Sequence, residues 1–238
     1  MHDNINDRLS IIVPVYNEEL AIGQVVSGLL EQCEDAEIIV VNDGSFDATC
    51  DRLKKFNIKV ITHRDNKGYG AAIKIGIGRA SRQVICIMDG DNTYRPLDIK
   101  KLTEFIDEFD MVVGARVNSA MAKMPFHQRI AKSSVCLLLN LIFKQKILDI
   151  NSGLRLFKKD TVEKYLSVLP DGFSFTASIT LAMLLHKQKI KYVPINYSER
   201  TGKTKVKIFN YTINFIKSYW RIIYNFKLKR LYIRSGHF

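Results

Sequence analysis

The chain has 238 residues, of which 47% are hydrophobic and 25% charged, and this composition excludes an intrinsically disordered or collagen-like protein. Its formal net charge of +12 is unevenly placed, because residues 1–119 balance to −5 (14 Lys and Arg against 19 Asp and Glu) and residues 120–238 to +17 (22 against 5). The strongly basic second half suggests an anionic partner, which could be nucleic acid, an anionic membrane surface or a phosphorylated ligand.

Short apolar runs alternate with amphipathic stretches along the first half of the chain. This alternation predicts an α/β fold with right-handed crossovers and a mostly parallel sheet covered by helices. One further strand-like run, Lys191–Ile195, lies in the second half. In chain order, the first half is predicted to contain strand Leu9–Val15, helix Glu19–Cys33, strand Glu37–Val41, helix Asp47–Phe56, strand Ile58–Thr62, helix Gly70–Ala80, strand Val84–Met88, helix Leu97–Phe109 and strand Met111–Ala115.

Three of the predicted strands end on polar or acidic residues. These exits are Tyr16–Glu18, Asn42–Ser45 and Asp89–Asp91. Ligands of open parallel sheets bind beyond the carboxyl ends of the strands, so we expect the three exits to meet at one edge. Taken alone, the first two exits are also explained as turns and helix caps, for which Asn, Asp, Ser and Gly are favoured.

The third exit is harder to explain as a turn. Asp89 and Asp91 follow five apolar residues and are separated only by Gly90. Two carboxylates two positions apart point to the same side, where they repel each other unless a cation neutralises them. Hard divalent cations such as Mg²⁺ or Mn²⁺ take oxygen ligands and keep positions for substrate phosphates. The pair therefore predicts a metal that holds a phosphorylated substrate, with Gly90 leaving room for the ligand.

Other nucleotide-binding and membrane-spanning patterns are absent from the sequence. Gly68-Tyr69-Gly70 lacks the third glycine of a dinucleotide fingerprint, and no P-loop motif occurs. The longest apolar run, Val135–Phe143, is far short of the ~20 residues of a membrane span. No signal peptide is recognisable, and the four dispersed cysteines fit a reducing compartment.

Two tracts have the pattern of helices that lie on a membrane surface. His127–Phe143 combines apolar residues with basic or amide residues, although packing on the sheet explains it equally well. For Lys207–Phe226 we favour the membrane, since Trp220 and several tyrosines stand among lysines and arginines.

Six motifs occur in order over about residues 9–206: IIVPVYNEE, VVNDGSFDAT, NKGYGAA, the Asp-Gly-Asp triplet, SGLRLF and RTGKTK. In these motifs the chain resembles the family 2 glycosyltransferases of GT-A fold. It is most similar to the branch of dolichyl-phosphate mannosyltransferase and bacterial polyprenyl-phosphate sugar transferases. The resemblance implies a GT-A domain over residues 1–206, with a nucleotide-sugar half at about 9–116 and an acceptor half at about 117–206. A basic amphipathic segment, 207–238, would follow it.

The resemblance also implies roles for individual residues. The donor would be a GDP- or UDP-sugar, bound with Mg²⁺ or Mn²⁺ at Asp89 and Asp91, of which Asp91 is the more direct ligand. The acceptor would be a polyprenyl phosphate, and the guanidinium forks would suit its phosphate oxygens. The residues implied are Pro14, Tyr16 and Glu18 for base and ribose, Asp43 for the base, Lys67 and Gly68 near the nucleotide, Arg116 for the acceptor or sugar phosphate, Ser152 and Arg155 as a substrate motif, and Arg200, Thr204 and Lys205 as a loop that closes over phosphates.

The chain departs from the family pattern at three places. Asn42 replaces the first Asp of the usual Asp-Asp-Gly-Ser, and Thr93 replaces a common glutamine. Where the family usually has a general base, in a Glu-Asp pair about 90 residues after the metal motif, this chain reads GFSFTAS (172–178) and has no carboxylate. An acceptor that is already anionic needs no base, so the absence favours a lipid phosphate.

We therefore predict a metal-dependent inverting hexosyltransferase, peripheral on the cytoplasmic face of a membrane, with no nucleic-acid partner. One alternative is the same fold acting on a saccharide or protein hydroxyl, against which the missing base counts. The other is a non-enzymatic basic module that binds nucleic acid or an anionic membrane, which explains the charge but not the carboxylates.

Overall fold

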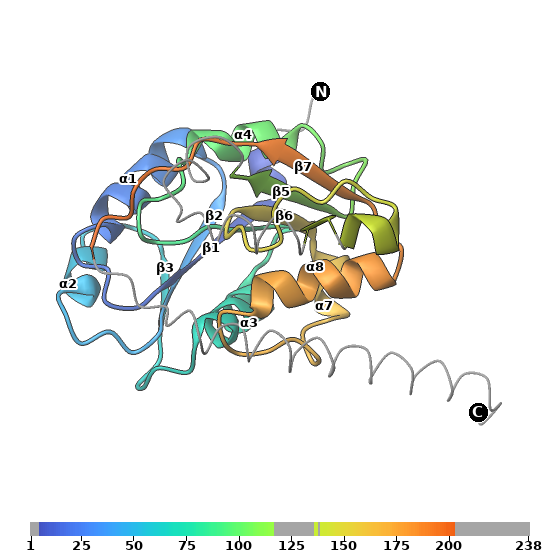
Figure 1. Ribbon diagram of the computed structural model, residues 1–238. Helices are drawn as coiled ribbons and strands as arrows, with labels where there is room; N and C mark the ends of the chain where they lie inside the picture. The colour runs from blue at the N-terminus through green and yellow to red at the C-terminus, as the bar shows by residue number, and fades with distance from the viewer. Residues whose placement is uncertain (1–4, 117–135, 138, 203–238) are drawn as a thin grey trace.

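The computed structural model describes residues 5–116, 136, 137 and 139–202 of the chain (Figure 1). It is an α/β fold in which one sheet lies between two layers of helices. In chain order, the elements are η1 (Ile5–Arg8), β1 (Leu9–Val15), α1 (Ile22–Gln32), β2 (Glu37–Asn42), α2 (Thr49–Leu53), β3 (Lys59–Thr62), α3 (Tyr69–Arg79), β4 (Val84–Ile87), α4 (Leu97–Thr103), β5 (Met111–Ala115), β6 (Arg155–Lys158), α7 (Lys159–Glu163), α8 (Phe175–Leu185) and β7 (Ile190–Pro194).

The sheet of the described residues has seven strands in the order β3-β2-β1-β4-β6-β5-β7. Its strands are parallel except β6, which runs antiparallel to both β4 and β5. β1, β2 and β4 are neighbours at the centre, with β1 paired to β2 from Ser10↔Glu37 to Val15↔Asn42. The three strand exits that we expected to meet, those of β1, β2 and β4, therefore lie side by side at one edge of the sheet. The predicted mostly parallel sheet is confirmed.

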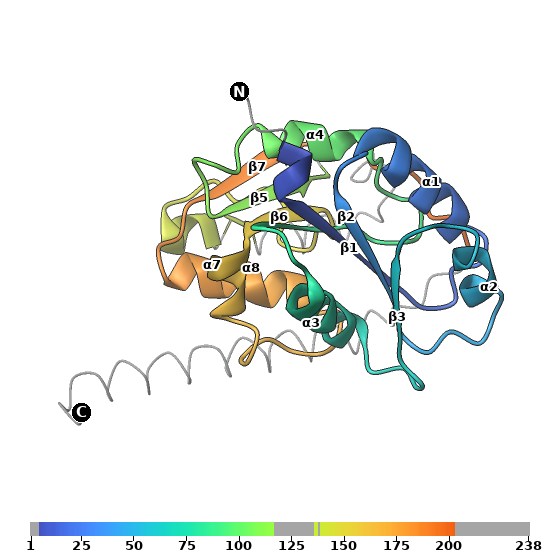
Figure 2. The same cartoon turned by 180° about the vertical axis from the view of Figure 1, so that it is seen from behind.

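Each face of the sheet has its own hydrophobic core. On one face, Leu9, Ile11 and Val13 of β1 pack with apolar residues of α1 and α4. On the other face, Ile12 of β1 packs with α3, α7 and α8. The two views of the ribbon show α1 and α4 on one side of the sheet and α3, α7 and α8 on the other (Figure 2). Burial on both faces explains why the central strands are apolar without alternation.

Most predicted strands are confirmed to within one residue, and two, β1 and β5, have the predicted bounds. Three of the predicted helices are shorter than expected: Glu19–Cys33 is helical over α1, Asp47–Phe56 over α2 and Leu97–Phe109 over α4, whereas α3 has the predicted length and is shifted by one residue. Asp47 precedes α2, whose N-cap is Ala48 and has no side-chain cap hydrogen bond. The Oδ1 of Asp47 accepts hydrogen bonds from the backbone N–H of Thr49 at 3.0 Å and from its hydroxyl at 2.5 Å, which fits the turn explanation for this residue.

Candidate active site

The exits of β1 and β2 are tied together by side chains. Asn17 takes a left-handed conformation (φ 52°), which asparagine tolerates, and its backbone N–H donates to the Ser45 hydroxyl at 2.8 Å. Its side-chain oxygen accepts from the backbone N–H of Phe46 at 2.9 Å. Tyr16 meets the 82% exposed Phe46 edge to face, with ring centroids 6.1 Å apart. Pro14, expected in the same pocket, is buried within β1. Asn17 belongs to the predicted strand exit Tyr16–Glu18 but was given no role of its own, and Phe46 was not singled out.

Asp43 fixes the loop between β3 and α3. Its Oδ1 lies 2.6 Å from Nδ1 of His63 and accepts from the backbone N–H of Lys67 at 2.9 Å, while its Oδ2 accepts from the backbone N–H of Gly68 at 2.8 Å. Gly68 has φ +105°, and a Cβ there would lie 2.5 Å from the Asp171 carbonyl oxygen, so only glycine fits. The predicted residues Asp43, Lys67 and Gly68 thus meet, but through the backbone of the last two. The buried His63 was missed.

Asp89 is held between a tyrosine and a glycine. The Tyr69 hydroxyl donates to its Oδ1 at 2.7 Å, and the Tyr69 ring stacks on Phe173 with centroids 5.5 Å apart. On the other side, a Cβ at Gly153 would come within 2.2 Å of the carboxylate. Burial, with the neighbouring Asp91, raises the pKa of Asp89 to about 6. Ionising Asp89 in the folded protein therefore carries an electrostatic cost, as the spacing of the two carboxylates predicts.

Asp91 has two sets of partners. Its Oδ1 accepts from the backbone N–H and the hydroxyl of Thr93, at 3.1 and 2.6 Å. Its Oδ2 lies 3.2 Å from Nη1 of Arg200, and Nη2 of the same arginine bonds to the carboxylate of Glu18. Arg200 thus links the exits of β1 and β4. Glu18, expected in the base and ribose pocket, pairs with the arginine in this structure.

Gly90 corrects one part of the sequence interpretation. A Cβ at this position would lie 2.5 Å from Cγ1 of Val15 and 3.3 Å from Cγ1 of Val13. The space beside the glycine is therefore filled by the side chains of β1 and not left for a ligand. Close packing on β1 is what brings the Asp-Gly-Asp turn against the central strand.

The carboxylate pair fits a hard divalent cation. Within the described ranges, no group of three or more His, Cys, Asp or Glu residues forms a complete metal site. Asp89 and Asp91 supply oxygens of the kind that Mg²⁺ and Mn²⁺ take, and such ions are bound by one or two carboxylates together with substrate phosphates. The raised pKa of Asp89 indicates negative charge that a cation would relieve. Thr93 donates its hydroxyl hydrogen bond to Asp91 and so holds that carboxylate in place.

Arg116 lies at the exit of β5, in a buried ion pair. Its Nε and Nη2 donate to the two oxygens of Asp149 at 2.7 and 3.0 Å, and its guanidinium lies 5.2 Å from the ring centroid of Tyr197. Asp149 is fully buried. Asp149 was not predicted, and its partner is 33 positions away in the sequence.

Ser152 and Arg155 face the protein and not an open site. The Ser152 hydroxyl donates to the Gly114 carbonyl oxygen at 2.6 Å. Arg155, fully buried, spends all five N–H donors on the carbonyl oxygens of Ile150, Ser152 and Thr176 and on the Thr180 hydroxyl. Any direct contact with substrate would require these bonds to break. In this structure Arg155 joins the turn 150–153, which touches Asp89 through Gly153, to α8, and its expected substrate role stays a prediction.

The remaining predicted elements lie outside the described residues. These are Thr204 and Lys205, the whole of 207–238, and most of His127–Phe143. Within the ranges that the structure describes, no helix is both long enough and apolar enough to cross a membrane.

Residues 10–166 match the model of the glycosyl transferase family 2. Among similar proteins, a dolichyl-phosphate hexose transferase of Haloferax volcanii is 28% identical over 204 residues, covering 85% of this chain and 88% of its own. A dolichol-phosphate mannosyltransferase of Pyrococcus furiosus is 30% identical over 220 residues, covering 86% of this chain and 61% of its own. A polyprenol monophosphomannose synthase of Mycolicibacterium smegmatis is 26% identical over 207 residues, covering 81% and 78%.

A similar solved structure is glucosyl-3-phosphoglycerate synthase from Mycobacterium tuberculosis in complex with Mn²⁺, UDP and phosphoglyceric acid. Its TM-score is 0.72 at 17% identity, and the match covers 90% of this chain and 78% of that one. This likeness shows the fold, which is the expected GT-A fold.

Fold and site together define a glycosyltransferase of GT-A type. The chain belongs to glycosyl transferase family 2, as its motifs indicated. The chain is therefore an enzyme, and the alternative of a non-enzymatic basic module is wrong.

Proposed function

We propose that this protein is a metal-dependent inverting hexosyltransferase that moves a sugar from a GDP- or UDP-sugar to a polyprenyl phosphate. The observation that carries the proposal is the carboxylate edge, where Asp89 and Asp91 at the exit of β4 lie beside the cation Arg200, next to the exit of the parallel strand β1. The named activities of the archaeal and mycobacterial relatives support a lipid-phosphate acceptor.

The donor would lie along the edge formed by the exits of β1, β2 and β4. Asp91 and Asp89 would hold Mg²⁺ or Mn²⁺, whose positive charge would stabilise the departing nucleoside diphosphate. The solved relative that binds UDP with Mn²⁺ supports this choice of ion. Arg200, beside Asp91, is placed to contact the diphosphate, because its Nε is buried with no hydrogen-bond partner among the described residues. A phosphate oxygen would satisfy that donor.

The acceptor would lie toward Arg116 and the start of α8. An oxygen of the lipid phosphate attacks the anomeric carbon, and the bond from that carbon to the donor phosphate breaks on the opposite face, which inverts the configuration. A phosphate monoester is already ionised, so no proton has to leave it and no general base is needed. At the expected position of a base, α8 begins with Phe175, Thr176 and Ala177 and offers no carboxylate. Asp149, which precedes α8 in the chain, is paired with Arg116.

The lipid acceptor requires the enzyme to reach a membrane. We propose peripheral attachment on the cytoplasmic face through the basic segment 207–238, in which Lys and Arg residues contribute roughly 1 kcal/mol each near an anionic surface. The relatives with polyprenyl-phosphate acceptors support membrane association.

A panel assay tests the proposal. The protein is incubated with Mn²⁺, a radiolabelled UDP- or GDP-hexose and one of three acceptors: undecaprenyl phosphate, dolichyl phosphate or 3-phosphoglycerate. We expect label in the organic phase with a lipid phosphate, and none with Asp91→Ala. Transfer only to 3-phosphoglycerate, or to another hydroxyl acceptor, would overturn the choice of acceptor.

A further inference from the structure

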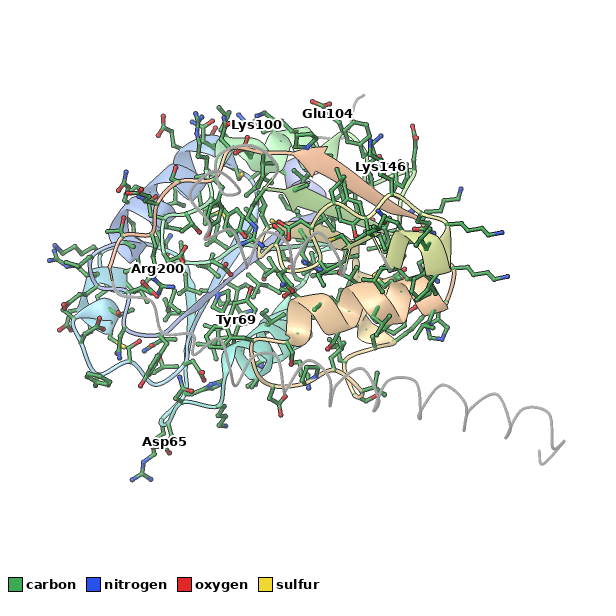
Figure 3. The ribbon with its side chains drawn as sticks, in the orientation of Figure 1. Asp65, Tyr69, Lys100, Glu104, Lys146 and Arg200 are labelled. Atoms are coloured by element: carbon green, nitrogen blue, oxygen red, sulfur yellow. The ribbon has the colours of Figure 1, made fainter. Side chains whose placement is uncertain are left out.

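The segment after β7 lies across the carboxylate edge. In Figure 1 it runs from β7 past α4 toward α1, and Figure 3 labels Arg200 on it. Two backbone hydrogen bonds dock it on the turn that carries Asp91, from Ser198 N–H to the Thr93 carbonyl oxygen at 2.9 Å and from Thr201 N–H to the Asp91 carbonyl oxygen at 3.2 Å. Tyr197 adds a ring contact to Tyr94, with centroids 5.2 Å apart. The segment is thus fixed over the metal-binding carboxylates by its own contacts.

Arg200 is placed by two carboxylates at once. Nη1 lies 3.2 Å from Asp91 Oδ2, and Nη2 bonds to Glu18 Oε1. The exposed fractions are 23% for the Arg200 side chain, 9% for Glu18 and 11% for Asp91, so solvent screens this triad much less than a surface pair. The guanidinium therefore neutralises the oxygen of Asp91 that is not already spent on Thr93.

We infer that Arg200 occupies the place of the divalent cation on Asp91 in the donor-free enzyme, and that Glu18 is the positioning residue that keeps it there. The inference rests on the proposed function, since it concerns the same metal and the same donor. Asp91 Oδ2 cannot serve the guanidinium and a metal ion equally well, because both cations compete for one carboxylate oxygen. Metal binding frees Arg200 from Asp91, and the donor's diphosphate supplies the new anion for its unpartnered Nε.

The exchange has a consequence for binding order. A metal ion alone must displace a resident guanidinium without offering it another partner, so it binds weakly. A metal ion with a nucleoside diphosphate offers phosphate oxygens to the displaced arginine, and the two bind cooperatively. Glu18 retains its own bond to Arg200 while Asp91 is released, which keeps the guanidinium at the edge of the site.

Mn²⁺ binding without nucleotide tests the exchange directly. Free Mn²⁺ is measured by electron paramagnetic resonance during titration of the wild-type chain, of Arg200→Gln and of Arg8→Gln as a control. Arg8 pairs with Asp107 on the surface and directly precedes β1, so it lies at the end of this strand opposite to the carboxylate edge. Its replacement should leave Mn²⁺ binding unchanged. For Arg200→Gln we expect Mn²⁺ alone to bind about tenfold more tightly, since a competing cation is removed. Equal or weaker binding would overturn the inference.

The same variant should have the opposite effect once nucleotide is present. With saturating Mn²⁺, we expect UDP or GDP to bind Arg200→Gln about tenfold more weakly than wild type, because a phosphate-binding cation is lost. If Glu18 acts through Arg200, then the single variant Glu18→Gln weakens nucleotide binding. The double variant then binds nucleotide no more weakly than Arg200→Gln does. Additive losses would overturn the role of Glu18.

Two further arms keep the result interpretable. Arg200→Lys keeps the charge but cannot bridge two carboxylates as a fork, so Mn²⁺ alone should bind it more tightly than wild type; this variant replaces Arg200→Gln if that protein fails to fold. If the wild-type chain binds no Mn²⁺ even with UDP or GDP, the proposed function fails as well. If the wild-type chain binds Mn²⁺ in the presence of nucleotide, but Arg200→Gln and wild type have the same affinity for Mn²⁺ without nucleotide, only the exchange fails.

Discussion

Replacing Asp89 with asparagine should stabilise the metal-free protein at neutral pH, although it removes a carboxylate that the site requires. Burial and Asp91 raise the pKa of Asp89 from 3.8 to about 6, so ionising it in the folded state is costly. At 1.36 kcal/mol per pKa unit, the shift corresponds to about 3 kcal/mol of stability lost above pH 6. Asparagine is nearly isosteric and can still accept the Tyr69 hydroxyl bond.

The sign of the effect depends on pH. Because the folded-state pKa is raised, this group's contribution is fully present below pH 3.8 and is lost as pH rises through about 6. The gain from Asp89→Asn should therefore be largest at pH 8 and close to zero at pH 4. Urea unfolding in the presence of a chelator, at both pH values, measures it as a difference between two nearly identical chains.

Asp149→Asn is the matched control. The chemical change is the same, but Asp149 is fully buried and makes a two-pronged ion pair with Arg116. Its loss leaves a guanidinium without its counter-ion and should destabilise the protein by about 3 kcal/mol. A gain for Asp89→Asn that does not vary with pH, or no gain at all, would refute the electrostatic reasoning.

Three other predictions concern the supports of the site and its attachment. Tyr69→Phe removes the hydrogen bond that lowers the pKa of Asp89, so Mn²⁺ binding, measured with nucleotide, should weaken and its pH profile should move to higher pH; an unchanged profile would show that the hydroxyl is unimportant. Arg155→Met should lower the free energy of unfolding by about 3 kcal/mol, because several buried carbonyl oxygens lose their donor, whereas a change in donor KM alone would restore the phosphate role. Removal of 207–238 should abolish salt-sensitive co-sedimentation with anionic vesicles, and equal sedimentation would direct attention to 127–143.

The central part of the fold was predictable from the sequence because its physics is local. β1, in which Ser10 is the one polar residue, and β5 are apolar runs bounded by polar residues, and their bounds were predicted without error. α8 lacks such a signal, since nearly all its residues are buried and no polar face gives it a helical period. β6 contains the buried Arg155, and a charged residue does not indicate a core strand.

The site divides in the same way. The carboxylates at strand exits could be predicted, since the edge at which parallel strands end follows from the topology. Their supports could not, because Tyr69 with Asp89, and His63 with Asp43, are partners 20 positions apart that only the tertiary fold brings together. Glycines posed a related difficulty: Gly90 was assigned to ligand space, but its neighbour is a side chain of β1.

The central claim is that the carboxylate edge transfers a hexose to a lipid phosphate with the help of a divalent cation. The most direct measurement follows radiolabelled sugar from UDP- or GDP-hexose into undecaprenyl or dolichyl phosphate with Mn²⁺, with excess chelator, and after Mn²⁺ is restored. The account predicts transfer that chelation stops and Mn²⁺ restores, and none with Asp91→Ala. Full transfer in chelator, or by the Asp91→Ala protein, would contradict it.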